Sequence, residues 1–219
     1  MTDFALARRN MVDGQLRPNR VTDVRLLEAV GGLPREKFLP ASLRSIAYAD
    51  DDVPLENGRF LMEPMVLARL IQYLQPRETD RAMVVASGRG YGAALLGRLV
   101  KSVVAVESDE TLAAAAERAF KEMGIDNVRQ AIGPLEGGAP DAAPFDVILV
   151  EGAVRQLSPA IVNQLAEGGR LTTVQASSAG RLGVAQLTVK AGGVSSSRPL
   201  FDAGTPVLPG FSPPARFTF

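Results

Sequence analysis

Residues 83–97 read MVVASGRGYGAALLG, an apolar run that passes through a turn containing Gly88 and Gly90 into helix-forming residues. A strand, a glycine-rich turn and a helix in this order are typical of nucleotide-binding folds, because glycine lets the main chain approach a ligand closely. The turn departs from the common pattern at Ala86, where a first glycine is expected. The stretch therefore predicts a strand, turn and helix at a ligand site, and leaves open whether a cofactor still binds there.

Beyond this turn the chain alternates between apolar strands and helical segments. Strands are predicted at RAMVVA, SVVAVE, NVRQAI, FDVILVE and GRLTTVQ, and Asp109 and Gly124 are placed to cap the helix after the second of them. Nearly all-apolar strands joined by helices indicate a parallel sheet covered on both faces. After Gly180 the segments GVAQLTVKAG and VSSSRPLFD alternate in polarity. We therefore predict an α/β fold, a doubly wound, mostly parallel sheet with an antiparallel C-terminal edge.

The first part of the chain has a different pattern, in which short helical segments follow one another. Thr22 is a predicted N-cap, and Pro34 and Pro64 suit the first turns of two further segments. The stretch PMVLARLIQYL spreads its apolar residues over a broad face, as a packed helix does. We predict a helical extension over residues 1–76, a sheet domain over residues 77–219 that ends in an extended tail, FSPPARFTF, and one compact unit formed by both.

Composition restricts the chemistry. The chain has 219 residues, with 24 Lys and Arg against 24 Asp and Glu, and it contains neither cysteine nor histidine. Balanced charge offers no basic field to nucleic acid, and no stretch is long and apolar enough to cross a bilayer, so we expect a cytoplasmic protein that binds neither nucleic acid nor membrane. Without thiolate or imidazole, Ser-His-Asp and Cys-His catalysis are excluded, and we predict no metal site.

An acidic residue at the end of the second predicted strand extends the argument from the glycine turn. Glu107 follows the turn by about twenty residues, where a carboxylate can accept hydrogen bonds from both ribose hydroxyls of an adenosine cofactor. The alternative is an exposed strand end with no ligand. The spacing of Gly88, Gly90 and Gly92, with Tyr91 between them, leaves little room for a pyrophosphate, and this favours S-adenosylmethionine over a dinucleotide.

Several blocks of this sequence resemble the protein-L-isoaspartate O-methyltransferase family in order and spacing. They are MVDGQL, PREKFLP, LRSIAYADDDVPLENGRFLMEPMVLARL, the glycine turn with GY, APFDVILVEGA and GGRL, and they extend from about Arg8 to Leu171. The resemblance implies a seven-stranded Rossmann-like methyltransferase sheet whose helical N-terminal extension helps to cover the substrate site. It also implies S-adenosylmethionine as cofactor, S-adenosylhomocysteine as product, and the carboxylate of isoaspartyl residues in damaged proteins as acceptor.

This implied chemistry agrees with the composition. A carboxyl group with a pKa near 4 is ionised at neutral pH and needs no general base before it accepts a methyl group. The site must instead align the reacting atoms and exclude water. The predicted cofactor-binding residues are Ser87, Gly88, Gly90, Tyr91, Glu107, Ser108, Gly133 and Pro134, and the predicted substrate-binding residues are Phe60, Leu61, Met62 and Glu151.

The sequence departs from the family pattern at polar positions. Met62 and Phe60 stand where the family usually has serine and threonine, and because that serine is regarded as the active-site residue, no catalytic residue is assigned. Val84 stands where an acid usually binds the amino group of the cofactor, and Pro134 where an Asp reaches the adenine. Losing those two contacts weakens cofactor binding by roughly 2 to 4 kcal/mol.

Two further charged residues have competing interpretations. Glu151 follows a predicted strand and is the best candidate for a new polar role, although a solvated strand end explains it as well. Arg89 could pair with an anionic substrate or with Glu107, or lie on the surface. Two hypotheses follow. The first is a carboxyl methyltransferase that acts on a peptide or protein carboxylate or on a small acid. The second is a non-catalytic module that binds a cofactor or a protein.

Overall fold

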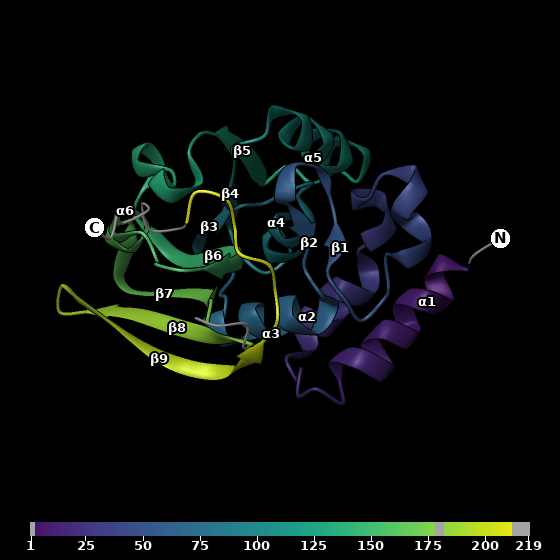
Figure 1. Cartoon of the computed structure of the whole chain (residues 1–219), viewed down its shortest axis with the longest axis horizontal. Helices are drawn as coiled ribbons and strands as arrows, with labels where there is room; N and C mark the ends of the chain where they lie inside the picture. The colour runs from purple at the N-terminus through teal and green to yellow at the C-terminus, as the bar shows by residue number, and fades with distance from the viewer. Residues whose placement is uncertain (1–2, 178–181, 212–219) are drawn as a thin grey trace, which may run out of the picture.

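The chain folds around a seven-stranded sheet (Figure 1). The computed structural model describes residues 3–177 and 182–211. The strands are β3 (Arg81–Val85), β4 (Ser102–Glu107), β5 (Val128–Ile132), β6 (Phe145–Val154), β7 (Leu165–Gln175), β8 (Gly183–Ala191) and β9 (Val194–Ala203). Their spatial order is β5-β4-β3-β6-β7-β8-β9, and the pairs from β5 to β7 are parallel while β7 with β8 and β8 with β9 are antiparallel. The predicted sheet and its antiparallel C-terminal edge are confirmed.

Alternate residues of the central strands face two separate hydrophobic clusters. Val84 and Leu149 belong to one cluster, whereas Val85 and Val150 belong to the other. The helices α3 (Pro64–Leu74), α4 (Tyr91–Gly97) and α5 (Glu110–Glu122) contribute to the first cluster, and α6 (Pro159–Asn163) with the 3₁₀ turns η5 (Leu135–Gly137) and η6 (Pro140–Ala142) to the second. Because both faces are covered, the middle residues of the central strands are apolar.

Helix ends follow local sequence in most places. Pro64 occupies the first turn of α3, Asp109 caps α5 by accepting from Thr111 N and Leu112 N, and Gly124 after α5 has a φ of 63°. The N-cap predicted at Thr22 was wrong by one residue. The helix α2 (Val24–Gly32) is capped by Asp23, whose carboxylate accepts from Leu26 N at 3.1 Å.

The N-terminal part is built from short helices, which lie at the end of the molecule opposite the β8–β9 pair (Figure 1). Besides α2 it contains α1 (Phe4–Met11), the π-helix η1 (Val12–Leu16) and the 3₁₀ helices η2 (Arg35–Phe38) and η3 (Ala41–Ile46). Side chains from this part, among them Phe38 and Leu39, share one buried cluster with those of the sheet domain. We propose on this basis that residues 1–76 and 77–219 form one unit.

A small antiparallel hairpin, which the sequence did not predict, precedes α3. It consists of β1 (Val53–Pro54), the 3₁₀ turn η4 (Glu56–Gly58) and β2 (Phe60–Leu61), and we call residues 53–61 the covering hairpin. Its base is buried at Val53 and Leu61, and Leu55 N donates to Arg59 O at 2.8 Å. The hairpin carries Arg59 toward the carboxyl ends of the parallel strands.

Two further observations concern the whole chain. Of the predicted tail FSPPARFTF, residues 212–219 lie outside the described residues. Among the helices that the structure describes, none combines the length and the apolar character that a membrane crossing requires.

Candidate functional site

The glycine turn joins β3 to α4 at the carboxyl end of the sheet, where ligands of open α/β sheets bind. Ala86 N and Ser87 N donate to Val106 O at 2.9 and 3.1 Å, and the backbone φ angles of Ala86, Gly88 and Gly90 are 66°, 55° and 92°. The left-handed conformation costs an alanine about 1 to 2 kcal/mol. The turn thus keeps a glycine-type backbone at Ala86 although the glycine is absent.

Gly90 and Gly92 are needed for packing. A Cβ atom on Gly90 would lie 2.6 Å from the Phe120 ring and 2.9 Å from Ala116, so α5 could not approach the turn as it does. A Cβ atom on Gly92 would lie 1.3 Å from Glu151 Oε1. The carboxyl group of Glu151 therefore fills the space where a side chain of residue 92 would begin.

Glu107, at the end of β4, has no solvent exposure and all its acceptor positions are used. Its Oε2 atom accepts from Gly88 N at 2.7 Å and from Arg59 Nη2 at 2.8 Å. Its Oε1 atom accepts from Ser108 N at 2.8 Å and from Asp109 N at 3.2 Å. A carboxylate offers about four lone-pair sites, so this one is saturated by the chain itself. The alternative of an exposed strand end at Glu107 is wrong.

Arg59 is the partner of Glu107 that sequence reasoning missed. The ion pair is buried, with 3% of the Arg59 side chain and none of the Glu107 side chain exposed. Only Nη2 of Arg59 is recorded as a donor, and its buried Nε and Nη1 atoms have no partner within the described part of the chain. Because the two residues are 48 positions apart and on different elements, no local spacing pointed to the pair.

The rest of the covering hairpin lies against the glycine turn. The Asn57 amide donates to the Asp109 carboxylate, which ties the hairpin tip to the start of α5. A Cβ atom on Gly88 would lie 3.5 Å from Leu55 Cδ1 and 4.0 Å from Phe60 O, so the hairpin is in contact distance of the turn. Leu55, Asn57 and Arg59 together cover the turn and the end of β4.

Glu151, near the middle of β6, is buried rather than solvated, which corrects the interpretation of a solvated strand end. Its Oε1 atom has no hydrogen-bond partner in the described residues. Burial raises the pKa of Glu151 to about 8, and Arg59 and Arg35 oppose this rise while Glu107 adds to it. The group is thus mainly protonated at pH 7.

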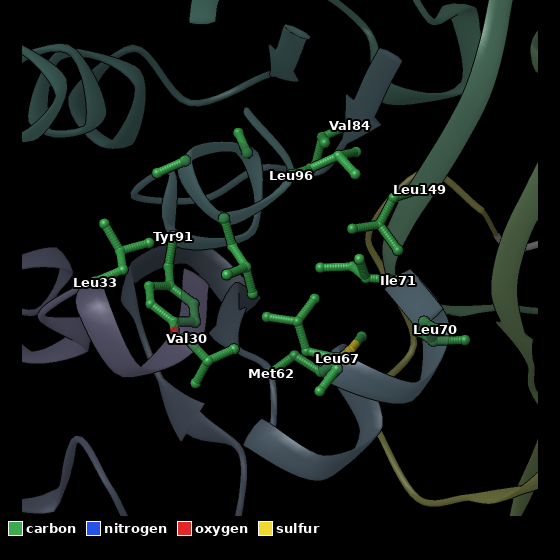
Figure 2. Close-up of a cluster of buried hydrophobic side chains, with 14 of the residues drawn as sticks. Val30, Leu33, Met62, Leu67, Leu70, Ile71, Val84, Tyr91, Leu96 and Leu149 are labelled. Carbon is green, nitrogen blue, oxygen red and sulfur yellow. The ribbon is translucent and has the colours of Figure 1, made fainter. Parts of the chain in front are cut away.

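Met62 packs in the hydrophobic core. Figure 2 shows Met62 with Leu67 and Tyr91 among the side chains of one buried cluster. The Met62 carbonyl accepts from Arg35 Nη2 at 2.6 Å, and the Arg35 guanidinium lies 4.9 Å from the centre of the Tyr91 ring. Arg35 belongs to the PREKF block, so these contacts join that block to the GRFLMEP block and to the glycine turn.

The other predicted site residues surround the same strand ends. Ser108 N is bound to Glu107, Gly133 N donates to Glu107 O at 3.1 Å, and Pro134 precedes η5. The Ser87 hydroxyl is buried and has no recorded partner among the described residues. Arg89 does not pair with Glu107, since its Nε donates to Phe38 O at 3.0 Å. The structure therefore brings Gly88, Ser108 and Gly133 to Glu107, Phe60 to Gly88, and Glu151 to Gly92. Tyr91 and Met62 both contact Arg35, whereas Leu61 lies in the base of the covering hairpin.

A separate cavity lies at the opposite end of the sheet. It has a volume of about 250 Å³ and is lined by residues at the amino ends of the parallel strands, including Arg81, Ser102 and Phe145. Open parallel sheets bind their ligands beyond the carboxyl ends of the strands, so we assign the site to the glycine turn and not to this cavity.

The sheet order, the glycine turn after β3 and the carboxylate at the end of β4 define a Rossmann-like methyltransferase fold. The sequence profile described as Protein-L-isoaspartate(D-aspartate) O-methyltransferase (PCMT) matches residues 7–193. The chain belongs to this family, and the predicted resemblance is confirmed.

Two relatives illustrate the relationship. The protein-L-isoaspartate O-methyltransferase of Koribacter versatilis is 41% identical over 171 residues, which cover 78% of this chain and 77% of the relative. That of Roseiflexus castenholzii is 40% identical over 169 residues, with 77% of each chain covered.

Two solved structures share the fold. A protein-L-isoaspartate O-methyltransferase superposes with a TM-score of 0.80 at 24% identity, over 93% of this chain and 66% of that one. A protein from Plasmodium falciparum, described under the same family name and solved with S-adenosyl-L-homocysteine, superposes with a TM-score of 0.75 at 21% identity, over 90% and 96% of the two chains.

Proposed function

We propose that the chain is an S-adenosylmethionine-dependent carboxyl O-methyltransferase. The observation that carries this proposal is the turn at Gly88 and Gly90, held in a glycine-type backbone against the buried carboxylate of Glu107. The family membership supports the reaction class, and the relatives described above carry the same enzyme name. The acceptor we propose is a peptide or protein carboxylate, or a small acid.

The residues present do not fit the cofactor in the arrangement seen. Ribose hydroxyls would have to donate to Glu107, whose oxygens already accept from Gly88 N, Ser108 N, Asp109 N and Arg59 Nη2. Leu55 and Phe60 also lie against Gly88. The proposed function thus requires a second arrangement in which Arg59 has left Glu107, and we derive no reaction step from the present one.

The acceptor side differs in character from the cofactor side. Met62 and Leu61 are buried and apolar, so neither side chain can donate a hydrogen bond to an acceptor carboxylate. An ionised carboxylate needs no base, and the chain has no histidine to supply one. These features support an acceptor that is bound by its apolar neighbours as much as by its charge. The cytoplasmic location stays a prediction.

Two measurements test the proposal in sequence. Calorimetry with S-adenosylmethionine should give a binding heat at millimolar ligand, and transfer of labelled methyl groups to an isoaspartyl peptide should exceed transfer to the same peptide with normal aspartate. Met62→Ser should raise that rate, since a hydroxyl returns a donor to the acceptor side. The enzyme hypothesis is refuted if millimolar ligand produces no binding heat and no thermal shift, both in the wild type and in variants that open the site.

A second function is favoured by one observation. Because Glu107 is saturated by the chain's own donors, the fold is also compatible with a non-catalytic module that binds a protein or a ligand other than an adenosine. Such a module would show no methyl transfer with any carboxylate acceptor, whether or not Arg59 is replaced.

A further inference from the structure

The contact between Arg59 and Glu107 is the point at which the structure and the proposed function disagree. We infer that the covering hairpin is an autoinhibitory element: its Arg59 guanidinium takes the place on Glu107 that the ribose hydroxyls of an adenosine cofactor would take, and it must leave before the cofactor binds. This inference rests on the proposed function, because it supposes that an adenosine ligand uses the glycine turn.

Three contacts of the hairpin converge on the elements that would receive the ligand. Arg59 Nη2 lies 2.8 Å from Glu107 Oε2, Leu55 lies against Gly88, and Asn57 donates to the carboxylate of Asp109. A guanidinium and a ribose both present hydrogen-bond donors to a carboxylate, so they compete for the same acceptor sites. The hairpin and the cofactor therefore exclude each other at Glu107.

Arg59 and Glu107 differ in how many hydrogen-bond partners each has apart from the other. A guanidinium has about five N–H donors, and the desolvation cost of burying the group is offset only when most of these donors are hydrogen-bonded. Arg59 leaves its buried Nε and Nη1 atoms without a partner in the described part of the chain. Glu107, in contrast, keeps three backbone donors when Arg59 departs, from Gly88, Ser108 and Asp109. The carboxylate thus stays in place for a ligand.

Glu151 is a second buried carboxyl group near Arg59. Glu151 lies within electrostatic range of Arg59, and its Oε1 atom has no partner among the described residues. The groups that face Glu151 are Arg59 from the hairpin, Arg35 from η2 and Glu107 from β4. Arg59 therefore binds one buried carboxyl group, Glu107, and lies within electrostatic range of a second, Glu151, whose Oε1 atom has no partner among the described residues.

The hairpin can open at its tip while its base stays packed. Val53 and Leu61 are 1% and 6% exposed and anchor the base in the core. The tip is held by the Leu55 N to Arg59 O bond, by Arg59 on Glu107, and by the exposed bond between Asn57 and Asp109. Asn57 and Gly58 have φ angles of 54° and 69°, so the tip is a tight turn.

The test is calorimetric titration of S-adenosylhomocysteine into the wild type, Arg59→Met and Arg170→Met. Methionine keeps most of the arginine stem without its charge, and Arg170 forms a comparable ion pair with Asp80 far from the turn. If the closed state is at least about tenfold more populated than the open state, Arg59→Met should lower the dissociation constant by about tenfold or more. Arg170→Met should bind as the wild type does.

Each other outcome decides the question. Equal affinity in the wild type and a folded Arg59→Met overturns the inference and leaves the proposed function standing. No binding by a folded Arg59→Met at millimolar ligand overturns both. If Arg59→Met does not fold, Asn57→Ala loosens the exposed tip instead and should tighten binding by a smaller factor, whereas an unchanged affinity in that variant overturns the inference. Replacing Glu107 as well, in Arg59→Met/Glu107→Gln, should abolish the gain.

Discussion

Two ion pairs, one partly and one fully buried, lie at opposite ends of the parallel strands, and their arginines have different numbers of hydrogen-bond partners. Near the amino end of β3, Arg170 Nε donates to Leu74 O at 2.9 Å, and its Nη2 donates to Gln75 O at 3.0 Å and to Asp80 Oδ2 at 2.8 Å. Near the carboxyl end of β4, Arg59 has one recorded partner, Glu107, and two buried nitrogens without one in the described residues. The first pair joins the end of α3 to the sheet, whereas the second lies at the proposed cofactor site.

The difference teaches where an ion pair stabilises and where it regulates. A buried charge with all its donors used offsets its desolvation, while one with few partners does so poorly and is more easily displaced. The acid is well bound in both pairs, since Asp80 also accepts from Arg77 N at 3.0 Å. The two pairs therefore differ in the number of hydrogen bonds that the arginine donates.

The largest effect is expected from removing the acid at the site. Glu107→Gln should lower the free energy of unfolding by about 3 to 5 kcal/mol, because it leaves Arg59 buried without a counter-charge and replaces an acceptor of backbone N–H groups. Urea denaturation would measure this loss. The double variant Arg59→Met/Glu107→Gln should recover part of it, and additive losses would show that the two residues are not coupled.

A smaller loss is expected at the other end. Arg170→Met removes bonds to two carbonyls at the C-terminal end of α3 and to Asp80, and should lower the free energy of unfolding by about 2 to 3 kcal/mol. Arg59→Met should cost less than this despite the deeper burial of its ion pair, because it removes a poorly satisfied charge. The reverse ranking in paired denaturation curves would contradict the comparison.

The smallest effect is a dependence on pH. Burial raises the pKa of Glu151 from 4.5 to about 8, so the folded state holds a proton that the unfolded state has lost above pH 4.5. Stability from this group is therefore present at low pH and is lost as the pH rises toward 8. Relative to Glu151→Gln, the wild type should lose about 1 kcal/mol between pH 7 and pH 8.

A matched control separates this effect from general titration. Glu117→Gln changes an exposed carboxylate on α5 and should leave the pH profile parallel to that of the wild type. Parallel profiles for the wild type and Glu151→Gln would show that Glu151 is ionised in the folded protein at pH 7.

Features that depend on residues close together in the sequence were easier to predict than features that depend on distant residues. The strands, the antiparallel edge and the caps at Asp109 and Gly124 were predictable, because periodicity and capping act within a few residues. The pair of Arg59 with Glu107 was not, since it joins residues 48 positions apart. The covering hairpin was not either, because its strands have only two residues each, too few for an alternating pattern to show. The burial of Glu151 was mispredicted because it depends on Gly92, on a different element.

That dependence constrains the history of the two positions. With Glu151 as it lies, a Cβ atom on residue 92 would be 1.3 Å from the carboxyl oxygen, so the two side chains cannot coexist in this arrangement. In this arrangement a buried glutamate at position 151 therefore requires glycine at position 92. In an alignment of relatives, a buried acid at 151 should therefore occur only together with glycine at 92, and the order of the two substitutions can be read from the branches.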